Sequence, residues 1–406
     1  MKLQKNYLCI IVISILCLTI LTNSQNYQIS GSDLSRENSN SKLFYTDHDP
    51  IEIASDEDFQ DYGFDGEGTF SQPYLIENLK IISPTDHAIF IHDTSKFFII
   101  RNCYFETDRR GIYLINTADW TVRIYDNIFV GNNEDGMVII DAHCFSIVGN
   151  SGYGDHATIN LINSTKGYIA NNYCFGGGNY TYLSSGGILL RNVNDTLVYD
   201  NYIDTFNRAI FTNDCFNLTI IQNYCKNSME YAGIYLYYTH LSQVINNTCI
   251  SNDGNGIRLY SSNFNLIKFN NISQNNLHGI NLLYSGLNII YSNNLIDNIP
   301  AGSSQGYDST GDNLWFNLET KKGNYWSNRT TDYYIIDPGT NVDFYPLVSP
   351  TYIEEQDLDI ILTDPFSADL TIVTEITGHS MILLFVISLS SIIFAFKLVK
   401  GRRKQN

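Results

Sequence analysis

The most regular feature of the chain is a short alternation of apolar and variable positions that recurs along its length. Each copy reads small, apolar, any, apolar. Clear copies begin at Ala88, Gly111, Gly136, Gly187, Ala209, Gly233, Gly256 and Gly279, and a poorer one begins at Ala157. Such alternation is typical of a strand with one buried face. Its recurrence every 21 to 30 residues predicts an all-β solenoid in which each repeat forms one coil.

A second register accompanies the first. The position fourteen residues after each start is asparagine in eight of nine copies. These are Asn102, Asn150, Asn171, Asn201, Asn223, Asn247, Asn270 and Asn293. Asparagine tolerates unusual backbone angles, and stacked asparagines hydrogen-bond along a column. We therefore predict a structural asparagine ladder, with the small residues at tight corners.

Composition limits the partners. Asp and Glu total 42 residues against 24 Lys and Arg. An excess of negative charge repels nucleic acid and anionic membrane surfaces, so nucleic acid is not expected as a partner. The six cysteines beyond the apolar N-terminus form no CxxC pair. They are predicted to be free, buried thiols rather than metal ligands.

The two apolar ends predict where the protein is found. Residues 1–24 read as a signal peptide, with an uncleaved anchor as the alternative. Residues 379–397 read as a transmembrane helix, and the basic residues at 398–406 place the tail in the cytoplasm. The prediction is a single-pass protein of the cell membrane with most of the chain extracellular. Seven sequons predict glycosylation, at Asn163, Asn179, Asn194, Asn217, Asn246, Asn271 and Asn328.

Three segments resemble a known family. They are the entry segment PIEIASDEDFQDYGFDGEGTFSQPYLIENLKI (50–81), the repeats, and the closing segment GNYWSNRTTDYYIIDPGTNVDFYPL (323–347). Together they resemble the NosD-like surface proteins, which are common in archaea, within the pectate-lyase-like superfamily. The resemblance implies a right-handed parallel β-helix of about ten coils and an archaeal source. The acidic Gly-Asp-Gly segment usual between GNYW and DFYPL is missing, and no Cys/His/Met cluster supports copper binding.

The domain organisation follows from these segments. The predicted parts are a signal peptide (1–24), a flexible leader (25–49), an entry cap (50–72), β-helix repeats (73–300), a closing cap (301–348), an acidic stalk (349–378), a transmembrane helix (379–397) and a basic tail (398–406). The insertion after Cys174 is expected to be a loop.

Candidate chemistry is sparse. A glycosidase needs paired carboxylates, and a lyase needs a base. Asp200 and Arg208 fall on different sides of one coil, and His278 reads as a turn residue. No catalytic or metal residue is predicted; no cofactor is expected, with calcium left open.

The variable position of each strand is more informative, because it points outward. The expected outward column reads Phe90, Tyr113, Val138, Ile159, Leu189, Phe211, Tyr235, Arg258 and Asn281. The expected ligand-binding stripe on this face is Phe90, Tyr113, Phe211, Tyr235, Tyr237, Arg258 and Tyr260. An exposed apolar column requires a cover, which is a sugar chain, a partner protein or another part of the chain.

The leading hypothesis is non-catalytic binding of a polysaccharide or a surface protein. The alternatives are a carbohydrate-active enzyme (a lyase, hydrolase or epimerase) and a structural component of the envelope.

Overall fold

The computed structural model describes residues 45–176, 185–299, 303–339 and 341–352. These ranges belong to one compact unit, Leu43–Glu354. The predicted signal peptide, transmembrane helix and basic tail lie outside the described residues, as do most of the leader, the stalk and the loop after Cys174. No helix in the described ranges is long and apolar enough to cross a membrane.

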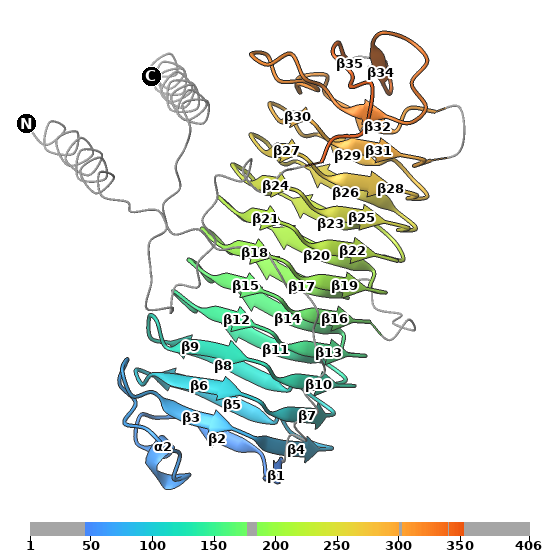
Figure 1. The fold of residues 1–406 in the computed structure, drawn as a ribbon. Helices are drawn as coiled ribbons and strands as arrows, with labels where there is room; N and C mark the ends of the chain where they lie inside the picture. The colour runs from blue at the N-terminus through green and yellow to red at the C-terminus, as the bar shows by residue number, and fades with distance from the viewer. Residues whose placement is uncertain (1–44, 177–184, 300–302, 340, 353–406) are drawn as a thin grey trace, which may run out of the picture. The chain divides into compact units, whose positions relative to one another are not determined.

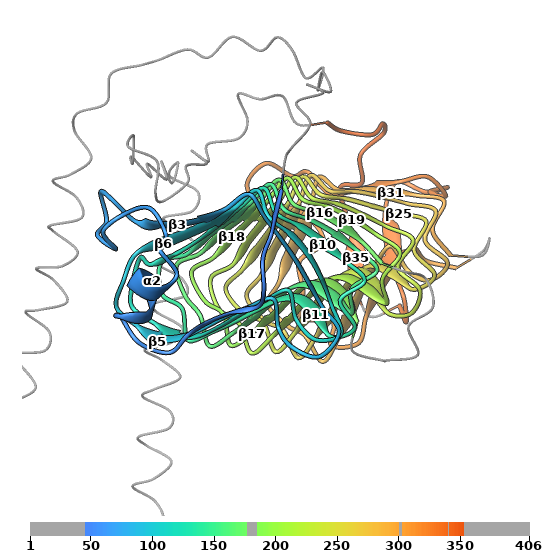
Figure 2. The same cartoon turned by 90° about the horizontal axis from the view of Figure 1, so that it is seen from below.

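The described residues form three parallel sheets and a short antiparallel pair (Figure 1). Each complete coil contributes one strand to each of the three parallel sheets, which we number I, II and III in the order in which the chain passes through them. The chain then continues into the next coil. The ten strands of sheet II mark ten complete coils in this part of the chain. Figure 2 looks along the stack and shows the coils enclosing one common interior. The predicted all-β solenoid of about ten coils is confirmed.

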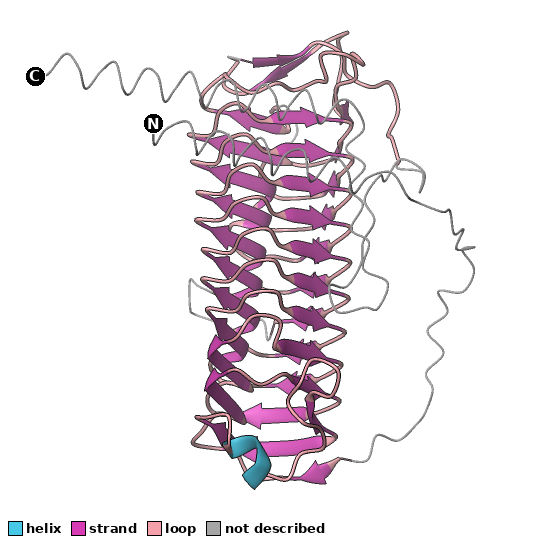
Figure 3. Cartoon of the chain, turned by 90° about the vertical axis from the view of Figure 1, so that its left-hand side faces the viewer, coloured by secondary structure: helices cyan, strands magenta, loops and turns pink. Residues whose placement is uncertain are grey.

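The strands are short and nearly identical from coil to coil (Figure 3). Sheet I comprises β2 (Ile51–Ile53), β5 (Ile89–Thr94), β8 (Ile112–Thr117), β11 (Asp135–Ile140), β14 (Ala157–Ile162), β17 (Gly186–Arg191), β20 (Arg208–Asn213), β23 (Ala232–Tyr237), β26 (Asn255–Tyr260), β29 (Ile280–Leu283) and β32 (Gly306–Asp308). Sheet II comprises β3 (Tyr74–Glu77), β6 (Phe98–Arg101), β9 (Val122–Tyr125), β12 (Ser146–Val148), β15 (Tyr168–Ala170), β18 (Leu197–Tyr199), β21 (Thr219–Ile221), β24 (Gln243–Ile245), β27 (Leu266–Lys268) and β30 (Ile289–Tyr291). Sheet III comprises β1 (Thr46–Asp47), β4 (Leu79–Ser83), β7 (Tyr104–Thr107), β10 (Ile128–Val130), β13 (Ser151–Tyr153), β16 (Tyr173–Phe175), β19 (Tyr202–Asp204), β22 (Tyr224–Lys226), β25 (Thr248–Ile250), β28 (Asn271–Ser273), β31 (Asn294–Ile296) and β33 (Tyr325–Trp326).

The interior is filled by columns of aliphatic side chains. Strands of sheet I place two residues inward, and the first of these are fully buried in every complete coil. That column is Ile51, Ile89, Ile112, Met137, Ile159, Ile188, Ile210, Ile234, Ile257 and Ile280. Burying each such side chain contributes about 1.5–3 kcal/mol. The core is therefore continuous along the stack.

The corners of the coils use left-handed backbone. One column of positive-φ residues separates sheet I from sheet II; it includes Asp93, Asn116, Asp141, Asn163, Asn192 and Asp214. Another separates sheet II from sheet III; it includes Asn78, Asn102, Asp126, Asn171, Asp200, Gln222 and Asn246. Asn and Asp tolerate this conformation better than other residues with side chains. These corners therefore explain why asparagine stands at several positions of the sequence.

The asparagine ladder lies next to the second of these columns. At one position per coil, a buried amide donates to the Oδ1 atom of the amide in the next coil and accepts from the amide in the previous coil. The ladder consists of Asn127, Asn150, Asn172, Asn201, Asn223, Asn247, Asn270, Asn293 and Asn324. Six of the eight expected residues lie in the ladder. Asn102 and Asn171 do not, because they are the left-handed corner residues that precede Cys103 and Asn172.

The error at Asn171 has a local cause. The copy assigned to Ala157 is one residue out of register, because Ala157 pairs with Asp135 and Ile159 pairs with Met137. Thr158 therefore occupies the position of the small residue. Its side chain is accommodated because Gly152 opposite has no Cβ, and a Cβ there would overlap it. Ile159 points inward, and the outward residue of this strand is Asn160.

The glycines that recur in the strands are required by close packing and not by a turn of the backbone. Gly111, Gly136 and Gly256 have ordinary φ angles, but an added Cβ at Gly111 would lie 2.5 Å from the Phe129 ring. The predicted corner role of these small residues is thus wrong in its reason. They face the interior, where there is no room for a side chain.

Both ends of the stack are closed. The first coil carries the short helix α2 (Asp58–Asp61), whose Phe59 packs on Tyr74 and Phe98. At the other end lie β34 (Tyr334–Ile336) and β35 (Asn341–Asp343), an antiparallel pair.

Residues of the closing segment (323–347) form the contacts of this second cap. Trp326 stacks on Tyr334 with 4.0 Å between ring centroids. Asp343 accepts hydrogen bonds from the Trp326 indole and from the Asn324 backbone, at 2.9 and 2.7 Å. The motif therefore seals the final coil.

The six cysteines of the described ranges are free and buried, as predicted. Burial raises the pKa of Cys103 and of Cys174 to about 12. These thiols stay protonated at neutral pH and act as small apolar side chains.

We expect the ladder and corner positions to respond differently to truncation. Asn223→Ala removes five side-chain hydrogen bonds from the interior and should lower the free energy of unfolding by about 3–5 kcal/mol. Gln222→Ala, at the adjacent left-handed corner, should change it by about 1 kcal/mol or less, because both side chains carry the same Cβ strain. Denaturant unfolding measures both. Equal losses would contradict the assignment.

A second prediction concerns a carboxyl in the core. Asp155 accepts two hydrogen bonds from Asn132, but its Oδ2 atom has no partner, and burial raises its pKa to about 7. The unfolded chain ionises near the ordinary value, so stability should fall by about 4 kcal/mol as pH rises from about 4 to 7. Asp155→Asn should remove this loss and stabilise the protein at pH 8. Thermal unfolding between pH 4.5 and 8 measures it, with the exposed Asp332→Asn as control; an unchanged pH profile would refute it.

Candidate functional site

The outward face of sheet I carries the residues singled out by the sequence. The strand register aligns one outward residue per coil, in the order Glu52, Phe90, Tyr113, Val138, Asn160, Leu189, Phe211, Tyr235, Arg258, Asn281 and Tyr307. A second outward column contains Arg191, Asn213, Tyr237, Tyr260 and Leu283.

The expected stripe is not a continuous exposed surface. Val138 and Leu189 are buried, at 4% and 0% exposure. They divide the stripe into two groups. Phe90 and Tyr113 stack in the early coils with 5.0 Å between ring centroids, whereas the remaining five residues lie together on β20, β23 and β26.

The second group is joined by Arg208 and Tyr231, and we call the seven residues together the Arg–Tyr cluster. They are Arg208, Phe211, Tyr231, Tyr235, Tyr237, Arg258 and Tyr260. The guanidinium carbon of Arg208 lies 4.5 Å from the Phe211 ring centroid and 4.4 Å from that of Tyr231. The guanidinium carbon of Arg258 lies 5.1 Å from the Tyr235 centroid. Stacking of guanidinium on aromatic rings stabilises each such pair by about 0.5–2 kcal/mol.

Within this cluster the tyrosines differ in access. Tyr235 is 6% exposed, with Tyr231 stacked at 5.9 Å. Burial raises the pKa of Tyr235, and the positive charges of Arg258 and Arg208 oppose the shift. It therefore supports the cluster rather than presenting a ring. Tyr237 and Tyr260 are half-buried and stack with 5.2 Å between centroids, so they form the accessible platform.

Several amide oxygens around the platform lack partners. The Oδ1 atoms of Asn213, Asn255 and Asn281 are buried and accept no hydrogen bond from the described residues. Asn255 is 1% exposed, and its Nδ2 atom donates to the Tyr231 carbonyl. An unpaired buried amide oxygen is costly, so these side chains lower the stability of this face rather than presenting acceptors at its surface.

A polar network lies between the two aromatic groups. Nδ1 of His156 is 2.8 Å from Oδ1 of Asp135, and the Asn160 amide donates to the other carboxylate oxygen at 2.8 Å. Arg191 donates to Asn160 Oδ1 at 2.7 Å. Burial lowers the pKa of Arg191, partly opposed by Asp135. This Asp135–Arg191 network was not predicted from the sequence.

Strand alternation alone could not identify these residues. Asp135 and Arg208 begin their strands, three positions before the outward residues Val138 and Phe211, so a strict period of two places them on the opposite face. The off-register copy at Ala157 concealed Asn160. The other weighed residues are separate: Asp204 pairs with Lys226 at 3.1 Å on sheet III, and His278 contacts Tyr307.

Sheet III carries a second row of rings that sequence reasoning did not find. Tyr173 stacks on Tyr202 at 4.6 Å, and Tyr202 stacks on Tyr224 at 5.4 Å, with interplanar angles of 10° and 1°. These rings cover one another's faces. The row is thus explained by stacking within the chain.

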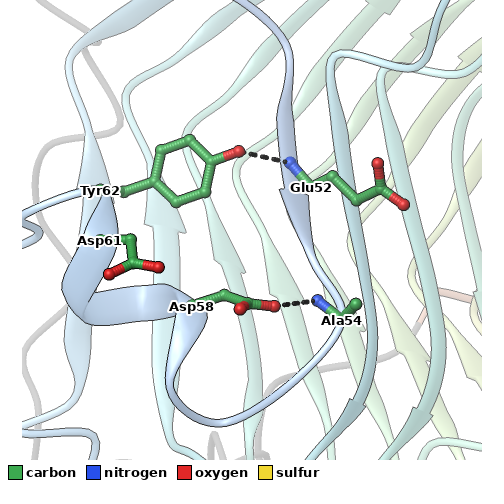
Figure 4. Close-up of a pocket in the computed structure, with 5 residues that line it drawn as sticks. All are labelled: Glu52, Ala54, Asp58, Asp61 and Tyr62. Atoms are coloured by element: carbon green, nitrogen blue, oxygen red, sulfur yellow. Dashed lines mark hydrogen bonds between the residues drawn. The ribbon is translucent and has the colours of Figure 1, made fainter.

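A shallow pocket marks the N-terminal end of the sheet I column (Figure 4). It is lined by Glu52, Ala54, Asp58, Asp61 and Tyr62. Asp58 accepts hydrogen bonds from the backbone of Ala54 and Ser55, at 2.7 and 2.8 Å, and Tyr62 accepts one from Glu52. The lining side chains therefore hold the entry segment against the first coil.

The predicted glycosylation sites differ in access. Asn163, Asn217 and Asn328 are exposed, whereas Asn194, Asn246 and Asn271 are half-buried. Asn328 uses its amide to donate to Ser303 and its oxygen to accept from Tyr334. Asn179 lies outside the described residues. Glycosylation stays a prediction.

Comparison with known proteins places this architecture. Residues 132–331 match the family described as periplasmic copper-binding protein (NosD), and residues 17–152 match the right-handed β-helix region. No curated protein matches the chain.

Several solved structures resemble the fold. A variant of the periplasmic alginate epimerase AlgG is 14% identical, with 61% of this chain and 82% of that chain covered and a TM-score of 0.37. The A-module of the mannuronan C-5 epimerase AlgE6 of Azotobacter vinelandii is 14% identical, with 59% and 73% covered and a TM-score of 0.35. Tailspike protein 3 of bacteriophage CBA120 is 8% identical, with 72% and 56% covered and a TM-score of 0.43.

The fold and the sheet I face define a right-handed parallel β-helix protein with a decorated outer sheet. The two family matches and the parallel solenoid support a NosD-like right-handed β-helix protein.

The copper implied by the family description does not fit the described residues. No group of three His, Cys, Asp or Glu side chains in these ranges could hold a metal ion. Copper binding by proteins relies on clustered thiolate, thioether and imidazole ligands, whereas these cysteines are buried with raised pKa values.

We expect the two outward clusters to differ in their contribution to stability. Arg208→Gln removes only ring contacts and should lower the free energy of unfolding by about 1 kcal/mol. Asp135→Ala leaves His156 and Asn160 without their carboxylate and should cost about 2–3 kcal/mol. Denaturant unfolding of both variants tests this. A large loss in Arg208→Gln would show that the arginine is structural.

Proposed function

We propose that the protein binds carbohydrate on the outward face of sheet I. The observation that carries this proposal is the Arg–Tyr cluster. A half-exposed tyrosine platform suits the apolar face of a sugar ring, and the partly exposed guanidiniums beside it can donate hydrogen bonds to sugar oxygens.

The arrangement also favours binding over a structural role for these residues. Rings on sheet III stack on one another, so their faces are used within the chain. The platform rings stack in the same way, so stacking alone does not distinguish the two surfaces. On sheet III the cation beside the rings, Lys226, is paired with Asp204 at 3.1 Å. Around the platform, by contrast, Arg208 and Arg258 pair with no carboxylate of the described residues.

Binding to the platform should depend on its accessible rings. We expect the full-length protein, purified in mild detergent, to be retained on one or more members of a panel of immobilised polysaccharides. Tyr237→Ala should weaken the retention about tenfold, because stacking area is lost. Tyr224→Ala, in the row on sheet III, is the matched control. Retention that is lost in both variants, or in neither, would argue against this face.

A second candidate is catalysis on the bound glycan. The His156–Asp135 contact of 2.8 Å is the geometry in which a carboxylate orients an imidazole for proton transfer, and Arg191 lies in the same network. The same experiment decides this if eluted glycans are sized. Shortened chains, restored to full length by His156→Gln, would favour an enzyme; intact chains favour binding alone.

A further inference from the structure

The Arg–Tyr cluster holds positive charge that no carboxylate of the described residues neutralises through a salt bridge. The sequence has a formal net charge of −18, yet Arg208 on β20 and Arg258 on β26 belong to none of the salt bridges in these ranges.

An unpaired guanidinium group is unfavourable, so a bound anion would stabilise this cluster. The Nε atoms of Arg208 and Arg258 are buried and have no acceptor among the described residues. A buried Nε without an acceptor is unfavourable, although stacking on aromatic rings stabilises the rest of each side chain. Both arginines are only half-buried, so an anion at the outer ends of the guanidiniums would supply the missing counter-charge through charge-assisted hydrogen bonds.

The spacing of the two guanidiniums fits a polymer. Arg208 begins β20, and Arg258 lies on β26, two strands further along the sheet. Two strand spacings are about 9.6 Å, and Arg258 also lies three positions along β26 from Asn255, the residue aligned with Arg208. The two side chains nevertheless converge on one ring. Between them lies Tyr231, with ring-centroid distances of 4.4 Å to Arg208 and 5.9 Å to Arg258. Charged groups at intervals along a chain can therefore meet both arginines while the intervening residue contacts the tyrosines.

The surroundings select a sugar over other polyanions. Tyr237 and Tyr260 present half-buried, stacked rings beside the arginines. A ligand that uses the whole face must thus bring an apolar ring face together with its negative groups. The net negative charge of the whole chain disfavours nucleic acid and anionic lipid surfaces, whose binding needs extended positive potential.

We propose that the ligand of this face is an anionic glycan, with its carboxylate or sulfate groups paired to Arg208 and Arg258. This inference rests on the proposed function of the sheet I face, and it names the class of carbohydrate. The geometry assigns Tyr237 and Tyr260 to the sugar rings and the two arginines to the charge.

The test compares glycans that share one backbone. Full-length protein in detergent is applied to immobilised dextran, carboxymethyl-dextran and dextran sulfate at two salt concentrations. We expect the anionic forms to bind at least tenfold more tightly than dextran, with weaker binding at high salt. Arg208→Gln and Arg258→Gln should each reduce affinity for the anionic forms by about tenfold. Lys322→Gln, which removes the same charge from an exposed site on the closing cap, should leave it unchanged.

The outcomes separate the two proposals. Equal binding to all three polymers that still requires Tyr237 would overturn the anionic class and leave carbohydrate binding intact. Binding lost equally in the Lys322→Gln control would show non-specific charge attraction and overturn the inference. A lack of binding to all three polymers, and to the wider panel, would overturn both. Preference for one anionic form identifies carboxylate or sulfate as the charged group.

Discussion

The structure depends on how the chain satisfies its peptide groups where each coil turns. A parallel strand loses its ladder partners at a corner, and a turn that faces the core has no water to replace them. From the third coil onward, the problem is solved by the asparagine side chain that follows the corner of the second column. An asparagine amide such as that of Asn223 caps two carbonyl groups and also binds the amide of the next coil. The residue before it takes the left-handed backbone that brings the side chain inward. Corner and ladder residues are thus a pair, and each makes the other possible.

Because the interior satisfies itself, the outer face of sheet I is free to vary. Its strands are the longest of the three sheets, mostly six residues, so each offers up to three outward positions. Successive coils place different chemistry at these positions: stacked rings near β5, a carboxylate–imidazole network near β14, and guanidinium over tyrosine near β23. None of these groups is needed to close a coil. This independence is the reason that the face, rather than the core, carries the evidence for function.

Sequence alone located the coils but not every residue within them. The period of about 23 residues and the paired registers were sufficient for the solenoid, because each coil must repeat the same inward and outward pattern. The register failed at Ala157, where a threonine replaced the usual small residue and a glycine on the neighbouring strand made room for it. Such exchanges between coils leave no mark in a local pattern. The same limit hid the Asp135–Arg191 network, since its members come from three strands and approach one another only after stacking. Arg258 was expected because it lies in the alternating column, whereas Arg208 was judged only as a partner for acids in its own coil.

The two caps also bear on how such a chain can change in length. The entry helix seals the first coil through Phe59, and Asp343 with Trp326 seals the last. Between the two caps, successive coils pair in the same way along each sheet. The packing of the core therefore does not fix the number of coils. A coil could be duplicated or lost without a new solution for the core or for either end. The number of coils can therefore change during evolution, and the length of the outer face of sheet I changes with it.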